Sequence, residues 1–211
     1  MPDAMPYIGT YMSMAKENLQ RVFDALREAG YTLIGPTKGE AAILYDEIER
    51  VSDLPIGWAD EQEAGTYRLR RRNDWAYFGF SVGPQSWKRF LYPPHVELFS
   101  VERQNGSFTV TANSKDVPRL AFIGVRACEL HAIGIQDRVL LGGPYQDPNY
   151  RARRREAFIL AVNCTHPGNT CFCASMRTGP HVGAGFDLAL TELEDVFVVE
   201  AGSEMGRQIM A

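Results

Sequence analysis

The sequence lacks the features that mark several large classes of protein. No apolar run approaches the ~20 residues that a membrane-spanning helix needs. The first residues contain no positively charged segment followed by an apolar one, so they do not form a secretory signal. We therefore expect a cytoplasmic protein, and its reducing environment makes disulfides the less likely use of the cysteines. A P-loop, an H-E-x-x-H helix and a Ser-His-Asp order are absent too, so nothing points to independent catalysis.

An excess of positive charge is also missing. The 211 residues contain 22 Lys and Arg against 26 Asp and Glu, a net charge of −4, which argues against a dedicated nucleic-acid binder. With 45% hydrophobic residues the chain can bury a sizeable core. No repeat or long linker divides it. We expect a single α/β domain over residues 1–211, with a mixed α+β lobe at 1–117 and a cysteine-bearing lobe at 118–211.

The first lobe has the pattern of short strands joined by hairpins. Apolar residues at helical spacing predict one helix over residues 14–29. The acidic segment 46–63 predicts irregular surface structure. Alternating or apolar stretches predict strands at residues 31–34, 41–45, 66–69, 75–80, 98–103 and 108–111. The last two flank Asn105 and Gly106, a pair that tolerates the positive φ of a hairpin turn.

The second lobe has the pattern of a parallel βαβ unit. Residues 120–125 and 158–162 are apolar runs typical of buried strands, and residues 128–140 repeat apolar positions at helical spacing. Cys128 follows the first strand and Cys164 follows the second. Neighbouring strands lie about 4.8 Å apart, so both thiols would emerge at one rim of the sheet, where open α/β sheets bind ligands. The loop after Cys164 would bring Cys171 and Cys173 to the same place, which predicts a metal site.

The cysteine spacing, C-x35-C-x6-C-x-C, leaves the kind of site open. It matches neither the paired cysteines of zinc fingers nor the compact run of bacterial ferredoxins, and four thiolates serve both structural zinc and iron–sulfur clusters. A plain core role is an alternative for Cys128, since free cysteine is often buried. A redox pair of Cys171 and Cys173 is disfavoured because the thioredoxin-like motif is C-x-x-C.

Several stretches resemble a known family. They are GVRACELHAIGIQDRVL, DPNYRARRREAFILAVNCTHPGNTCFCASMRTGP, GFDLALTEL and VVEAGSEMG, together with the earlier SVGPQSWKRFLYPPHVELF. These are similar to the β subunit of sulfhydrogenases and anaerobic sulfite reductases. The family has electron-transfer subunits with a dicluster ferredoxin module after an N-terminal α/β domain. That module needs eight further cysteines, which this sequence lacks, so the resemblance is to the N-terminal domain.

The resemblance implies a cofactor and a role. It favours an iron–sulfur cluster, [4Fe–4S] in particular, over zinc at the four cysteines Cys128, Cys164, Cys171 and Cys173. Arg126 and Arg177 could then offset the negative charge of the cluster. The start of the helix would stabilise the Cys128 thiolate. His131 or His166 could replace a thiol as ligand, although a partly exposed polar role suits them better.

The function expected from the resemblance is that of an electron-transfer component rather than an independent catalyst. Its partners would be flavin- or NAD-binding subunits and hydrogenase or sulfite reductase subunits. One alternative is a non-redox subunit-assembly module whose cysteines bind structural zinc or no metal. Another is a small-molecule-binding domain that uses the sheet rim without metal. The glycines of residues 179–185 lack the G-x-G-x-x-G order of a dinucleotide site and would give the loop backbone freedom.

Overall fold

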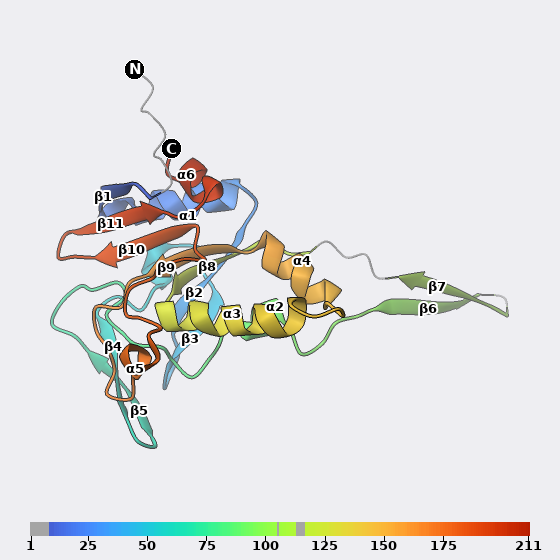
Figure 1. Ribbon diagram of the computed structural model, residues 1–211, viewed down its shortest axis with the longest axis horizontal. Helices are drawn as coiled ribbons and strands as arrows, with labels where there is room; N and C mark the ends of the chain where they lie inside the picture. The colour runs from blue at the N-terminus through green and yellow to red at the C-terminus, as the bar shows by residue number, and fades with distance from the viewer. Residues whose placement is uncertain (1–8, 105, 113–116) are drawn as a thin grey trace.

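The computed structural model describes residues 9–104, 106–112 and 117–211. Its centre is a seven-stranded sheet with the strand order β1-β11-β10-β9-β8-β2-β3 (Figure 1). The strands are Tyr11–Ala15 (β1), Thr32–Lys38 (β2), Ile43–Glu47 (β3), Leu120–Val125 (β8), Phe158–Val162 (β9), Leu188–Glu192 (β10) and Val196–Ala201 (β11). The middle strands pair in parallel, and the pairings at both edges are antiparallel. The predicted α/β class with a mixed sheet is confirmed.

Strands β8 and β9 form the middle of this sheet because they are apolar along their whole length. Five of the six residues of β8 and all five of β9 are buried. Continuous apolar runs of this kind are typical of parallel strands covered on both faces. The predicted parallel pairing of the two strands is confirmed, and the connection between them contains two helices, Ala127–Leu141 (α3) and Pro148–Glu156 (α4).

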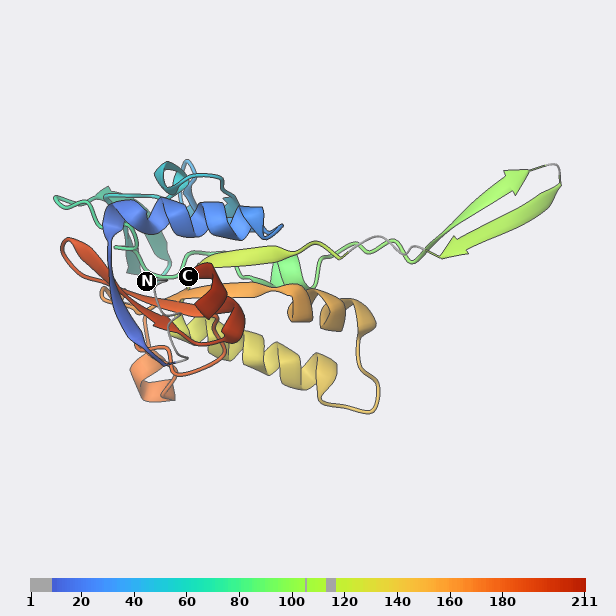
Figure 2. The same ribbon diagram turned by 90° about the horizontal axis from the view of Figure 1, so that it is seen from above.

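Helices cover both faces of the sheet (Figures 1 and 2). Leu19–Glu28 (α1) and Glu204–Ile209 (α6) pack on one face, and α3, α4 and the short Lys88–Leu91 (α2) pack on the other. The strands supply both cores by alternation, since Leu160 belongs to the core under α1 and Ile159 to the core under α3 and α4. The helix predicted at residues 14–29 is confirmed over α1, whose apolar stripe is buried, but the prediction began too early, because residues 14 and 15 belong to β1 and residues 16–18 form a 3₁₀ turn.

Two hairpins lie outside the main sheet. Trp58–Glu63 (β4) pairs with Thr66–Arg71 (β5), and Phe99–Gln104 (β6) pairs with Ser107–Ala112 (β7). The second hairpin was expected, although Asn105 itself lies outside the described residues. Strand β4 falls in the segment predicted to be irregular, so that prediction was wrong in part.

The predicted strand at residues 75–80 was also wrong. This segment has no strand partner, yet Phe78 and Phe80 are buried in the core. The carboxylate of Glu192 replaces the missing strand, because it accepts hydrogen bonds from the backbone N–H groups of Tyr77 at 2.7 Å and Phe78 at 2.9 Å. Lys16 donates to the same carboxylate at 2.8 Å and balances its charge.

Three short helices complete the described chain: Cys173–Met176 (α5), and the 3₁₀ turns Lys16–Asn18 and Val51–Asp53. Within the described ranges, no helix has both the length and the apolar character to cross a membrane. Strands β2 and β3 of the expected first lobe lie in the same sheet as β8, so the expected boundary near residue 117 divides a continuous sheet. The assignment of residues 1–211 to one domain stays a prediction.

Gly124 shapes the end of β8 just before the first cysteine. Its φ is +88°, and the register between β8 and β9 shifts between Ile123 and Val125. A Cβ at this position would lie 3.1 Å from Cε1 of Phe78. Glycine is therefore required both by the backbone conformation and by the close approach of an aromatic ring.

Replacing this glycine should test both requirements. We expect Gly124→Ala to lower the free energy of unfolding by about 2–4 kcal/mol, since strain at positive φ and crowding against Phe78 add together. Gly65→Ala is the matched control, because Gly65 has a φ of +75° but open space where the Cβ would lie. It should lose only about 1–2 kcal/mol. If the two variants lose the same free energy of unfolding in chemical denaturation, crowding against Phe78 does not contribute to the cost at Gly124.

Candidate functional site

The topology gathers all four cysteines at one edge of the sheet. Cys128 is the second residue of α3, directly after β8, and Cys164 follows the end of β9. Since β8 and β9 are parallel neighbours, their carboxyl ends open at the same edge. Cys171 lies in the loop that follows, and Cys173 begins α5. The four residues line a single cavity of about 220 Å³, and all four are free thiols.

The loop that carries Cys171 is fastened to strand β4. Thr170 Oγ1 donates to Oε1 of Gln62 at 3.1 Å, and Asn169 Nδ2 donates to Glu63 at 2.9 Å. Gln62 Nε2 in turn donates to Ser81 Oγ at 3.1 Å and to the carbonyl oxygen of Val82 at 2.9 Å. Gln62 is thus a positioning residue for the cysteine loop. No sequence pattern indicates this role, because Gln62 lies in the acidic segment expected to be irregular.

Backbone groups fix the positions of individual sulfurs. The N–H of Gly168 donates to Sγ of Cys171 at 3.3 Å, and the N–H of Cys171 donates back to the carbonyl oxygen of Gly168 at 3.0 Å. Gly179 packs so closely that a Cβ there would lie 3.4 Å from Sγ of Cys173. Hydrogen bonds to sulfur are one of the means by which proteins adjust metal–thiolate centres.

Arg126 brings a buried positive charge to the cavity. It is only 3% exposed and lines the cavity with the cysteines. Its Nη2 donates to the carbonyl oxygens of Phe78 at 2.6 Å and Phe80 at 2.8 Å, and Nη1 donates to that of Asn163 at 3.3 Å. Nε is buried without a partner, and no ion pair joins this guanidinium to a carboxylate among the described residues. The charge of Arg126 acts on the buried carboxylate of Glu129 without forming an ion pair with it, and a buried cation without a direct anionic partner is costly.

The Cys128 thiol differs from its expected state. Burial, followed by the negative charge of Glu129 and the neighbouring thiols Cys173 and Cys171, raises the pKa of Cys128 to about 11. The backbone N–H of Glu129 at the start of the helix lowers this pKa, in the expected direction, but desolvation outweighs it. In the metal-free protein Cys128 is a neutral thiol at pH 7, and it would lose its proton on binding a metal.

The other expected participants lie elsewhere. His131 is exposed on α3 and lines a different cavity. His166 contacts Thr165 through Nδ1 at 3.0 Å and Arg72 through Nε2 at 3.1 Å, and burial together with Arg72 lowers its pKa. Arg177 is exposed and is not among the residues that line the cysteine cavity. Of the expected charge-balancing residues, only Arg126 reaches the site.

The thiols stand around the cavity and do not converge on one point. Within residues 9–104, 106–112 and 117–211, no group of three or more His, Cys, Asp or Glu side chains is arranged to hold a single metal ion. A tetrahedral zinc ion would need sulfurs about 3.8 Å apart, given zinc–sulfur bonds of about 2.3 Å. The assignment of the four cysteines as metal ligands stays a prediction.

The fold and the cavity together describe an α/β protein with a cysteine-lined site at the carboxyl end of its parallel strands. Comparison with known proteins adds a relative. The chain is 28% identical to sulfhydrogenase 2 subunit beta of Pyrococcus furiosus over 200 residues, which are 95% of this chain and 51% of that protein. This identity supports a relation to that family, and the chain spans about half the length of the relative. No protein-family model and no solved structure matches the chain.

The fastening of the cysteine loop can be tested by hydrogen exchange. We expect Gln62→Ala to speed the exchange of the backbone amides at residues 167–171 about five- to tenfold, because it removes the partners of Thr170, Ser81 and Val82. Glu61→Ala is the control, since Glu61 is exposed on the same strand. If both variants exchange alike in mass spectrometry, the loop is held by other contacts.

Proposed function

We propose that this chain is an electron-transfer domain of a hydrogenase-type or sulfite-reductase-type complex. In this proposal Cys128, Cys164, Cys171 and Cys173 bind an iron–sulfur cluster, of the [4Fe–4S] type in preference to zinc. The observation that carries the proposal is that four free thiols from distant points of the sequence line one cavity. The relation to a protein named as a sulfhydrogenase subunit supports it.

The arrangement of the thiols suits a cluster better than a single ion. In a cluster the cysteines bind separate irons, so they stand around a volume, as they do around this cavity of about 220 Å³. A structural zinc site would require all four sulfurs to meet at one centre. Cys171 is exposed, which leaves one side of the site open to a redox partner.

The residues of this chain would set the properties of the bound cluster. When bound, an iron–sulfur cluster supplies a centre that accepts one electron and passes it on. The buried guanidinium of Arg126 would offset the negative charge of the thiolates, and the N–H of Gly168 would donate to the sulfur of Cys171. Both interactions favour the more negative, reduced state. Electrons would pass between a flavin- or NAD-binding subunit and a hydrogenase or sulfite reductase subunit.

The β6–β7 hairpin supplies a surface for one such subunit. It extends away from the body of the molecule in both views (Figures 1 and 2). Val101 lies opposite Val110, and period-two alternation puts Phe99 and Phe108 on the same face. These side chains are highly exposed: Phe99 58%, Val101 51%, Phe108 68% and Val110 65%. A two-stranded hairpin is marginally stable alone, so this apolar face suits a covering subunit.

Anaerobic reconstitution tests the cluster. With iron and sulfide, the protein should gain a broad visible absorbance and stoichiometric iron, and the reduced sample should give an electron paramagnetic resonance signal. Cys164→Ser should lose most of the bound iron, because one of four ligands is removed. Ala174→Ser is the control, since it adds the same hydroxyl beside Cys173 but leaves every thiol in place. A colourless protein that takes up zinc and no iron would favour the non-redox assembly module.

The apolar face of the β6–β7 hairpin can be tested separately from the cluster. We expect Val101→Glu to weaken association with a partner subunit at least tenfold in co-purification or titration, because it buries a charge in an apolar contact. Thr109→Glu is the matched control, as Thr109 lies on the opposite face of the same hairpin. If the two variants weaken association equally, the apolar face is not the interface. Loss of a dimer of this chain in the first variant would instead identify a second copy as the occupant.

A further inference from the structure

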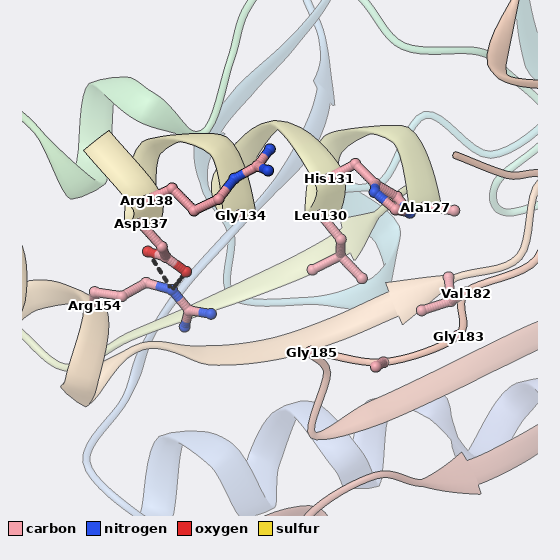
Figure 3. Close-up of a pocket in the computed structure, with 11 residues that line it drawn as sticks. Ala127, Leu130, His131, Gly134, Asp137, Arg138, Arg154, Val182, Gly183 and Gly185 are labelled. Carbon is pink, nitrogen blue, oxygen red and sulfur yellow. Dashed lines mark hydrogen bonds and ion pairs between the residues drawn. The ribbon is translucent and has the colours of Figure 1, made fainter. Parts of the chain in front are cut away.

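A second cavity, of about 550 Å³, lies beside helix α3 and away from the cysteines. Helix α3 forms one wall, and the loop at residues 182–185 forms the other (Figure 3). Arg154 reaches the cavity from α4. Ala127 is the one residue that lines both this cavity and the cysteine cavity. The volume of this second cavity is in the range of small-molecule sites.

A pre-oriented guanidinium faces this cavity. Arg154 Nε donates to both carboxylate oxygens of Asp137 at 3.2 Å, and the buried Tyr150 hydroxyl donates to Oδ1 of Asp137 at 2.7 Å. The two terminal nitrogens of Arg154, Nη1 and Nη2, form no hydrogen bond with any described residue. Figure 3 shows the guanidinium beside Asp137 on the side of α3 that faces the sheet, with the loop that carries Gly185 further along the helix. Asp137 thus holds the guanidinium through Nε and leaves Nη1 and Nη2 available to donate to an anion.

The glycines of the cavity have no packing role within the chain. Gly134 lies in the middle of α3, where glycine destabilises a helix relative to alanine. A Cβ at Gly134 or Gly183 would meet nothing within 4 Å, and neither residue has a positive φ. The protein itself therefore gives no steric reason for glycine at these two positions. Glycine at these positions keeps part of the cavity open, because a larger residue would place its side chain there.

The loop and the charges around the cavity also suit an anion. Among the described residues, the backbone N–H groups of Gly183, Ala184 and Gly185 have no hydrogen-bond partner. Arg138 adds a second cation, and Asp137, the single carboxylate of the lining, is already paired with Arg154. The lining thus carries an excess of positive charge opposite three free backbone donors.

We propose that this cavity binds a small molecule that bears a phosphate group. The fork of Arg154 would take two oxygens, and the N–H groups of residues 183–185 would take oxygens that point away from the fork. A tetrahedral phosphate offers oxygens in both directions, whereas a carboxylate would use both of its oxygens at the fork. Ala127, Leu130 and Val182 give the remaining volume an apolar wall for the rest of the ligand. The proposal does not depend on a cluster at the cysteines.

Isothermal titration calorimetry on the full chain, with pyrophosphate, ADP, adenosine and citrate as probes, tests this site. We expect pyrophosphate and ADP to bind, with ADP tighter, and adenosine and citrate to bind at least tenfold more weakly. Arg154→Gln should weaken ADP binding at least tenfold. Arg151→Gln is the matched control, because it removes the same charge from the same helix at an exposed position outside the lining.

Gly134→Leu and Gly183→Val provide a test that leaves the ion pair intact. Both add side chains into open space, and leucine favours the helix more than glycine does, so the melting temperature should not fall for Gly134→Leu. Both should weaken ADP binding at least tenfold by filling the cavity. Absence of binding by pyrophosphate and ADP at millimolar concentration would overturn the proposal. So would equal weakening by Arg154→Gln and Arg151→Gln, or citrate binding as tightly as pyrophosphate.

Discussion

The parallel pairing of β8 with β9 is the constraint on which the rest of the structure depends. Both strands are buried on two faces, so their backbone groups must be satisfied by neighbouring strands. Once this pairing forms, the chain has no freedom in where Cys128 and Cys164 emerge. Two cysteines with 35 residues between them in the sequence then open onto one cavity.

The remaining parts of the cysteine cavity come from outside that unit. Gln62 on β4 fastens the loop of Cys171, and the carbonyl oxygens of Phe78 and Phe80 hold Arg126. The segment that carries those two carbonyls is itself held by the carboxylate of Glu192. The position of a buried charge next to the thiols therefore depends on a chain of polar contacts that spans most of the sequence. Such contacts are worth about 1–3 kcal/mol each when a charged group takes part, so the arrangement is specific as well as stable.

These dependencies explain which features the sequence could predict. The strands at 120–125 and 158–162 were found because continuous apolar runs are a local signal, and the convergence of the cysteines followed from their parallel pairing. The segment 75–80 has strand-like residues, yet its hydrogen bonds go to Glu192, more than a hundred positions away. Strand β4 carries acidic residues and gave no signal. The helix dipole suggested a stabilised thiolate at Cys128, but the degree of burial, which raises its pKa, is known only from the fold.

Helix α3 serves the two cavities with different parts of its surface. Its first turn carries Cys128, and the turns that follow present Leu130, Gly134 and Asp137 to the larger cavity. At about 1.5 Å of rise per residue, Cys128 and Asp137 are separated by about 14 Å along the helix axis. Ala127 is the one residue that lines both cavities. Because thiols form one lining and a guanidinium with open glycine positions forms the other, the two sites have separate chemistry. Each can therefore be altered without replacing a residue that binds at the other.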